Sequence, residues 1–423
     1  MSAEVICIGT ELLLGDILNT NCQYFAQELA NLGIPHYYQT VVGDNIERIH
    51  RVLDTAIARS SILIFTGGLG PTPDDLTTET IASFFNTPLV EDAAIIRDIE
   101  TKFAAIGRVM SPSNRKQALV PQGAITLPNP TGTAPGIIWQ PKSNITIMTF
   151  PGVPSEMHRM WRDTAVPFLK SQGWGQNIIY SEMMRFRGIG ESALAEKVAH
   201  LFEMSNPTVA PYAGKGEVRL RIAAKAGDRI KAEAMIKPVA TEIKQIAGLD
   251  YFGSNEDTLA TVVGRLLKER GETLCVAASC TGGGLGAMLT EIPGSSSYFL
   301  GGVIAYANRV KNALLKVDRQ DLEEFGAVSD PVARQMALGV KQSLQTDWGI
   351  GITGIAGPDG GTETKPVGLV YIGLATPENE AIARQYRFGQ QRGRELIRYL
   401  SSCAALDLLR RSLLERSTMN NGQ

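Results

Sequence analysis

Residues 61–75 read SILIFTGGLGPTPDD, an uncharged run that breaks into a glycine-rich turn followed by two carboxylates. Such a run is typical of a strand buried on both faces, and the turn lies where α/β proteins bind ligands, at the strand's carboxyl end. Apolar runs alternate with amphipathic stretches around it, which predicts a parallel sheet with helices on both faces, an α/β fold. The nearest expected elements are strands 5–9, 36–42 and 61–66 and helices 20–32, 46–59 and 75–85.

The alternation continues to about residue 172, with a helix across the 90s, strands at 136–139 and 145–150 and a helix from Ser155. Between 179 and 252 the order changes to β-α-β-β-α-β, which predicts a small α+β module. A second α/β sandwich begins near Thr258 and ends in a helix that starts at Arg392. The predicted domains are therefore 1–172, 173–254 and 255–418.

Composition excludes several classes of protein. The chain has 423 residues, 44% of them hydrophobic and 20% charged, with a net charge of -2. This near-neutral balance gives no electrostatic footprint for duplex nucleic acid, and no run approaches the roughly 20 apolar residues of a membrane helix. The start, MSAEVICIGT, runs directly into a strand without a leader-like region, so we expect a cytoplasmic protein. Five cysteines without a CxxC pair favour neither a disulfide framework nor a zinc ribbon.

The turn after strand 61–66 is a candidate phosphate site. Gly67, Gly68 and Gly70 allow close approach of a ligand, and a helix N-terminus offers free N–H groups to phosphate. Asp74 and Asp75 supply the oxygen ligands that hard divalent cations prefer, usually together with substrate phosphates. The alternative is that either aspartate caps the helix that follows.

A second candidate site follows the strand TLCVAAS (273–279). Ser279 lies on a tight strand-to-helix turn followed by Cys280, Thr281 and three glycines. This is the geometry of a nucleophile with an oxyanion hole, and equally that of a phosphate cradle. Ser295–Ser297 forms a competing hydroxyl cluster.

A serine nucleophile needs a base, and residues 201–423 contain no histidine. A Ser-His-Asp triad or a Cys-His pair is therefore excluded unless another domain donates the histidine. Lysine is the remaining candidate if burial lowers its pKa. We select Lys311, one helical turn beyond Asn308 and just past a strand expected beside that of Ser279. The alternative is an ordinary solvated helix lysine.

The N-terminal motifs resemble a known family. TGGLGPTPDD, GTELLLGDILNTN (9–21), NPTGTAPG (129–136) and PGVPSEM (151–157) are similar to the molybdopterin-binding (MogA/MoaB-like) domain of the CinA family. The resemblance implies functional aspartates at Asp44 and Asp75 and a metal-dependent pyrophosphatase acting on ADP-ribose-type nucleotides. Phosphate would then lie on the three glycines and a divalent metal on Asp74 and Asp75. Glu156 would either join this site or cap its own helix.

The C-terminal motifs AASCTGGG, IPGSSSYFLGGVIAYANRVK, GAVSDPVA and GITGIAGPDGGTETKPVG resemble nicotinamide mononucleotide deamidases. The resemblance implies hydrolysis of the carboxamide to nicotinate mononucleotide and ammonia by a metal-free Ser/Lys pair. On this sequence the pair is Ser279 and Lys311, with Tyr306 orienting or deprotonating it or else packing in the core. Implied substrate contacts are Thr281, Gly282, Gly283, Asn308, Gly354 and Gly357.

Two positions depart from that pattern. Ala278 stands where the family commonly has a glutamate before the serine, and Arg309 and Val310 replace a second family glutamate before the lysine. If the glutamate orients the lysine or the substrate, deamidation is weakened or lost. The rival reading is a protein that binds nucleotides without turnover.

The middle module is described in the CinA family as KH-like, and a KH domain clamps nucleic acid with a GXXG loop. The nearest match, RGIG (187–190), lacks that spacing. The basic residues Lys215, Arg219, Arg221 and Lys225 have no aromatic ladder beside them. We therefore expect a spacer or dimer-building element, with RNA binding as the alternative.

Together these features predict a three-domain hydrolase of pyridine-nucleotide salvage. Its expected partners are small nucleotides and a second copy of the chain, without membrane or nucleic acid. The one expected cofactor is a divalent metal in the N-terminal domain. A role as a DNA-uptake or recombination accessory is suggested only by the family's name, and the net charge speaks against it.

Overall fold

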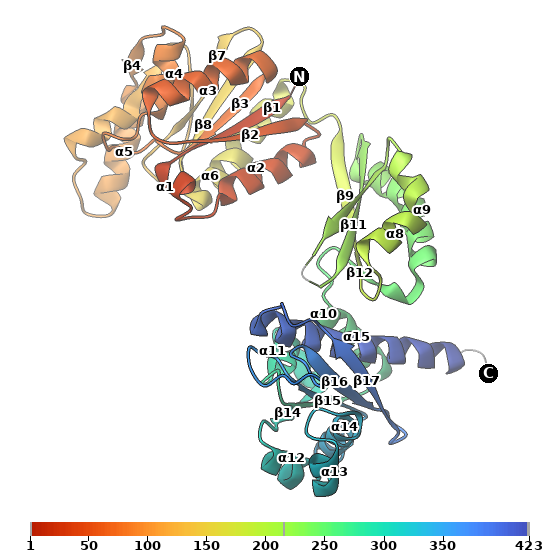
Figure 1. The fold of residues 1–423 in the computed structure, drawn as a ribbon. Helices are drawn as coiled ribbons and strands as arrows, with labels where there is room; N and C mark the ends of the chain where they lie inside the picture. Colours follow the sequence, from red (N-terminus) through yellow and green to blue (C-terminus); the bar gives the residue numbers. More distant parts are fainter. Residues whose placement is uncertain (1, 215, 421–423) are drawn as a thin grey trace. The chain divides into compact units, whose positions relative to one another are not determined.

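The computed structural model describes residues 2–214 and 216–420 (Figure 1). The chain forms two compact units. The first holds residues up to Ser181 with two short segments of the middle module, Ser205–Pro207 and Ala223–Pro238, and the second holds the rest. The predicted α/β class is confirmed in both, whereas the three domain boundaries remain predictions.

The N-terminal sheet has six strands in the order β2-β1-β3-β8-β7-β6. The first four are parallel, but β7 pairs antiparallel with both β8 and β6, so the expectation of a parallel sheet is wrong at this edge. Only Ser143 and Asn144 connect β7 to β8, and so short a connection can join only antiparallel strands. The strands are β1 (Ala3–Ile8), β2 (His36–Val42), β3 (Ile62–Thr66), β6 (Ile125–Leu127), β7 (Gly136–Lys142) and β8 (Ile145–Phe150).

Helices cover both faces of this sheet, as predicted. Figure 1 shows α2 (Thr20–Asn31) and α6 (Pro154–Met160) on one face and α3 (Ile46–Arg59), α4 (Thr77–Phe84) and α5 (Ala93–Ala105) on the other. Each face has its own apolar core, one around Trp161 and the other around Trp139. The smaller elements are α1 (Thr10–Leu14), β4 (Leu89–Glu91), β5 (Leu119–Pro121) and α7 (Val166–Ser171), and 3-10 or π turns at Pro112–Ala118 and Trp161–Ala165.

The middle module has the predicted element order. Its four strands form one sheet in the order β10-β11-β9-β12. The elements are β9 (Ile178–Phe186), α8 (Glu191–Lys197), β10 (Thr208–Ala213), β11 (Val218–Ala226), α9 (Arg229–Ala247) and β12 (Tyr251–Ser254), with 3-10 turns at Ala199–Glu203 and Gly248–Asp250.

The C-terminal sheet has the order β14-β13-β15-β16-β17, in which β14, β13 and β15 are parallel. Helices α10, α11 and α15 pack on one face and α12 and α14 on the other (Figure 1). The strands are β13 (Leu274–Ala278), β14 (Phe299–Ile304), β15 (Trp348–Gly354), β16 (Leu369–Ala375) and β17 (Ala381–Arg387). The helices are α10 (Leu259–Arg270), α11 (Gly284–Thr290), α12 (Asn308–Leu315), α13 (Arg319–Glu324), α14 (Asp330–Leu344) and α15 (Arg394–Asn420), and a 3-10 turn covers Ser295–Ser297.

Helix α15 is held by a buried charged cluster. The Arg410 guanidinium, 1% exposed, donates to Asp407 Oδ1 from Nε at 3.0 Å and from Nη2 at 2.6 Å. It also donates to the main-chain oxygens of Leu249 and Tyr251, and Arg411 donates to Asp407 and Asp250. Among the described residues, no helix combines the length and the apolarity needed to cross a membrane.

Asp407→Ala should lower the free energy of unfolding by about 3–5 kcal/mol, because it leaves the Arg410 charge buried without a counter-ion. The measurement is urea unfolding of the full chain. Arg334→Ala, which breaks the exposed pair with Asp330, is the control and should cost less than about 1 kcal/mol. Equal losses of unfolding free energy in the two variants would contradict a larger contribution of the buried cluster to stability.

Candidate active sites

Ser279 and Lys311 meet in the C-terminal unit. Ser279 follows β13 directly, Lys311 lies on α12, and α12 follows β14, the parallel neighbour of β13. The Lys311 Nζ lies 3.1 Å from the Ser279 Oγ, although 32 residues separate them in the sequence. This proximity agrees with the expectation from strand order.

Lys311 is 1% exposed, so its reading as a solvated helix lysine is wrong. Its Nζ also donates to the carbonyl oxygens of Ala305, at 3.0 Å, and Tyr306, at 3.1 Å. Burial lowers the pKa of Lys311, which favours the neutral amine. A neutral amine has two N–H groups, one for each carbonyl, and a lone pair that can accept the Ser279 hydroxyl proton. The arrangement therefore suits a general base acting on a serine nucleophile.

The turn after Ser279 is held in a tight conformation. The Gly282 N–H donates to the Ser279 carbonyl at 2.9 Å, and Gly282 and Gly283 have left-handed φ angles of 58° and 90°. Within the described chain, no main-chain carbonyl accepts from the N–H groups of Cys280, Thr281 or Gly283. The N–H groups of Cys280 and Thr281 lie against the Cys280 sulfur, and that of Gly283 is available to a ligand oxygen beside Ser279.

Cys280 lies beside the pair but does not compete as a nucleophile. Its side chain is buried, and burial raises the pKa of the thiol to about 11. Since the thiolate is the reactive form of cysteine, Cys280 is inert at neutral pH.

The other predicted C-terminal residues lie around this turn. Tyr306 is 60% exposed, so core packing is wrong, and its hydroxyl accepts a hydrogen bond from Arg394 at 3.1 Å. Asn308 is exposed at the start of α12, and Gly354 ends β15. The Gly357 carbonyl accepts from Arg394 at 2.7 Å.

Sequence reasoning missed two arginines on α15. Arg394 and Arg398 lie one helical turn apart, and Arg398 donates to the Thr281 carbonyl from Nη2 at 2.8 Å. More than 110 residues separate them from Ser279 in the sequence, so no local pattern connects them with the turn. Only the packing of α15 on this face of the sheet brings them to the turn.

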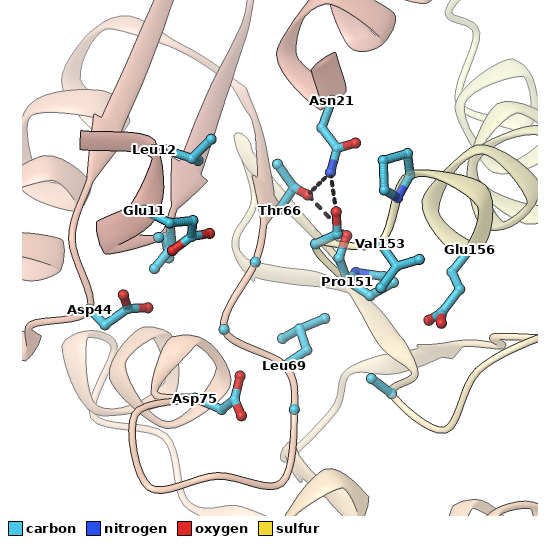
Figure 2. A pocket seen from close by; sticks show the side chains of 18 of the residues that line it. Glu11, Leu12, Asn21, Asp44, Thr66, Leu69, Asp75, Pro151, Val153 and Glu156 are labelled. Carbon is cyan, nitrogen blue, oxygen red and sulfur yellow. Dashed lines mark hydrogen bonds between the residues drawn. The ribbon is translucent and has the colours of Figure 1, made fainter. Parts of the chain in front are cut away.

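The predicted N-terminal residues line a cavity of about 660 Å³. Figure 2 shows Glu11, Asp44 and Asp75 on one side of it and Glu156 on the other. The turn of Gly67, Gly68 and Gly70 passes between them. Asn21, from α2, completes the wall and donates to the Thr66 hydroxyl and the Gly152 carbonyl, both at 2.9 Å.

The glycines of this turn are needed by its geometry. Gly67 and Gly68 have φ angles of 105° and 65°, in the left-handed region. A Cβ on Gly70 would lie 2.4 Å from Asp75 Oδ2, so this glycine leaves room for the carboxylate. The turn and Asp75 therefore form one packed unit.

Neither Asp74 nor Asp75 caps α4, so that alternative is wrong. The helix begins at Thr77 after Leu76, without a side-chain cap. Both carboxylates instead lie 2.5 Å from the Thr72 hydroxyl, whose hydrogen bond lowers the pKa of Asp74. Glu156 makes no cap bond in α6 either, and accepts from Asn129 at 2.6 Å.

The charge of the cavity wall is one-sided. In the described part of the chain no Lys, Arg or His lines it, whereas five carboxylates do: Glu11, Asp44, Asp74, Asp75 and Glu156. No three His, Cys, Asp or Glu side chains of the described residues converge as a complete metal site. The residues therefore fit a divalent cation that keeps waters and shares substrate phosphates rather than one in an all-protein cage.

Comparison with known proteins agrees with this architecture. Residues 4–171 match the family model of the probable molybdopterin binding domain, residues 181–278 that of the damage-inducible protein CinA KH domain, and residues 256–413 that of the CinA C-terminal domain. A CinA-like protein of Gloeothece citriformis is 68% identical over 98% of this chain and 99% of its own.

The chain belongs to the CinA family. A CinA-like protein of Nostoc sp. is 69% identical over 98% of this chain and 100% of its own. The crystal structure of competence/damage inducible protein CihA from Agrobacterium tumefaciens covers 37% of this chain and 93% of its own, with 37% identity and a TM-score of 0.36.

The middle module of this CinA-family chain carries the basic residues noted above. Arg219 pairs with Glu217, and Arg221 lies 5.6 Å from the Tyr212 ring, so one aromatic side chain does accompany them. Arg187 donates to the carbonyls of Gly216 and Leu400. Lys215 lies outside the described residues.

The Ser/Lys geometry can be tested without any substrate. A sulfonyl fluoride should modify Ser279 about 100-fold faster than the exposed Ser297, because Lys311 can take the hydroxyl proton. Mass spectrometry of the labelled peptides measures both rates. Lys311→Met should abolish the difference, and equal rates in the wild type would contradict an activated Ser279.

Proposed function

We propose that the C-terminal domain hydrolyses the carboxamide of nicotinamide mononucleotide. The observation that carries the proposal is the buried Lys311 amine, 3.1 Å from the Ser279 Oγ and held otherwise by two carbonyl oxygens. The resemblance of the surrounding motifs to the deamidase family supplies the substrate.

In the proposed reaction the Ser279 oxygen forms a bond to the carboxamide carbon while its proton passes to the Lys311 amine. The negative charge on the carboxamide oxygen is stabilised by main-chain N–H groups of the turn. The C–N bond then breaks, and ammonia leaves with the proton from Lys311. Water attacks the acyl ester, gives a proton to Lys311, and nicotinate mononucleotide leaves as Ser279 regains its proton.

The substrate's phosphate needs a cation, and Arg394 is placed to supply one. Its guanidinium is exposed beside the loop from Gly354 to Gly361 and uses one N–H on Gly357 and one on Tyr306. Three of its five N–H donors remain for a phosphate. In this scheme Tyr306 contributes through its carbonyl, which orients Lys311, and through its hydroxyl, which orients Arg394.

We expect the site to work with alanine at position 278. Its side chain is buried, and its carbonyl accepts from the Ala305 N–H at 2.8 Å, which fastens the Lys311 loop to the end of β13. The carbonyls of Ala305 and Tyr306 orient the amine without a carboxylate. Nucleotide binding without turnover is the rival outcome of the following test.

The test is ammonia release from nicotinamide mononucleotide in the presence of a chelator. Wild type should turn over, and Ser279→Ala and Lys311→Met should each lose about 100-fold or more, since each removes a group that bonds or moves the proton. Because the pKa of Lys311 is lowered, kcat/KM should rise with pH and level off below the ordinary lysine pKa.

Cys280→Ala is the matched control, because it changes the neighbouring side chain and leaves the pair intact. It should retain activity. Substrate binding by calorimetry without any turnover in the wild type would favour the nucleotide-binding protein instead.

For the N-terminal domain we propose metal-dependent hydrolysis of an ADP-ribose-type pyrophosphate. An anionic substrate cannot enter a cavity of five carboxylates without a cation to offset them. Asp74 and Asp75 would hold the divalent ion, which would stabilise charge on the bridging oxygen. The N–H groups of the Gly67–Gly70 turn would bind phosphate oxygens, and Asp44 and Glu156 would line the rest of the site.

Hydrolysis of ADP-ribose should require Mg²⁺ or Mn²⁺, stop with EDTA, and fall about 100-fold in Asp75→Asn. The rate of hydrolysis is measured with a coupled assay for the phosphate of the released mononucleotides. Asp54→Asn, an exposed position on α3 outside the cavity, should behave as wild type. Full activity with EDTA would contradict the proposal.

A further inference from the structure

The guanidinium of Arg398 is bound to the main chain of the turn after Ser279. Its Nε and Nη2 donate to the Thr281 carbonyl oxygen at 3.2 and 2.8 Å, and the Gly284 N–H donates to the same oxygen at 3.2 Å. The Thr281 side chain itself is fully buried. Arg398 therefore bonds the backbone of the turn that carries the N–H groups beside Ser279.

These bonds fix the orientation of one peptide group at both ends. The carbonyl of the Thr281–Gly282 peptide faces Arg398, while its N–H donates to the Ser279 carbonyl at 2.9 Å. Gly282 and Gly283 adopt left-handed φ angles and have no Cβ to resist rotation of the adjoining peptides. Without Arg398, two main-chain hydrogen bonds alone would hold this peptide, so the N–H groups of the turn would be less firmly aimed at the carboxamide oxygen.

The position of Arg398 is itself fixed by its helix. Four residues earlier, Arg394 bonds Gly357 and Tyr306. Thirteen residues later, Arg411 bonds Asp250 and the Arg187 carbonyl. Arg398 thus lies on a continuous helix anchored on both sides of it, so its guanidinium has little freedom to follow a moving turn.

We propose that Arg398 is a positioning residue for the deamidation: it holds the Ser279 turn in the conformation that stabilises the developing oxyanion. The inference rests on the deamidase function proposed above. A positioning role predicts loss of kcat with little change in KM, because the N–H groups of the turn act mainly on the charge that develops in the transition state.

The experiment compares wild type with Arg398→Met in nicotinamide mononucleotide deamidation. Arg398→Met should lower kcat about 10- to 100-fold and change KM less than about threefold. This loss of kcat is no larger than the loss that follows removal of a hydrogen-bond donor that contacts the oxyanion directly. Arg398→Lys should recover part of kcat, since one ammonium donor can still reach a carbonyl. If Arg398→Met does not fold, kcat and KM are compared between wild type and Arg398→Lys instead.

Arg416→Met, on the same helix but paired with Glu378 away from the turn, is the control and should retain wild-type kcat. An unchanged kcat in Arg398→Met overturns the inference. So does a raised KM at constant kcat, which would make Arg398 a substrate-binding residue. A wild type that does not deamidate at all overturns the proposed function instead.

Discussion

The C-terminal domain depends on one constraint, the burial of the Lys311 amine against Ser279, where its hydrogen-bond partners among the described residues are neutral oxygens. Burying an amine is costly when it is charged and cheap when it is neutral, so the site favours the form that can accept a proton. A carboxylate in contact with the amine would reverse this preference by stabilising the ammonium form. An alanine at position 278 leaves the amine to be oriented by the carbonyls of Ala305 and Tyr306.

Several other contacts of the domain hold Ser279 and Lys311 together. Parallel pairing of β13 with β14 brings the two chain segments to one sheet edge, and the hydrogen bond from Ala305 to Ala278 fixes their register there. On the opposite side of the turn, α15 contributes Arg394 and Arg398. The buried Asp407–Arg410 pair anchors the same helix to the segment around Tyr251, so the contacts that stabilise the fold also set the position of the turn.

Much of this was predictable from sequence because the signals are local. Buried strands and glycine turns follow from apolar runs and residue type, whereas the Ser279/Lys311 pair also needed the resemblance to the deamidase family. The antiparallel edge formed by β7 was missed although the two-residue connection at Ser143 and Asn144 requires it, since its apolar run resembles those of the parallel strands. The contact of Arg398 with the turn and the hydrogen bonds of Thr72 could not be predicted. The periodicity of apolar residues shows neither how a helix packs on a segment more than 110 residues away nor which path a turn takes.

The two candidate sites have opposite electrostatics, and this difference underlies the different metal requirements that we propose for them. Around Ser279 the chain supplies two cations of its own, Arg394 and Arg398, so the proposed anionic mononucleotide would meet positive charge without a metal. The N-terminal cavity offers a phosphate only main-chain N–H groups, set among five carboxylates. Main-chain N–H groups carry only partial charges, so we expect a phosphorylated ligand to enter this cavity together with a cation. The metal dependence proposed for one domain and the metal independence proposed for the other therefore both rest on the placement of charged side chains rather than on the shared α/β fold.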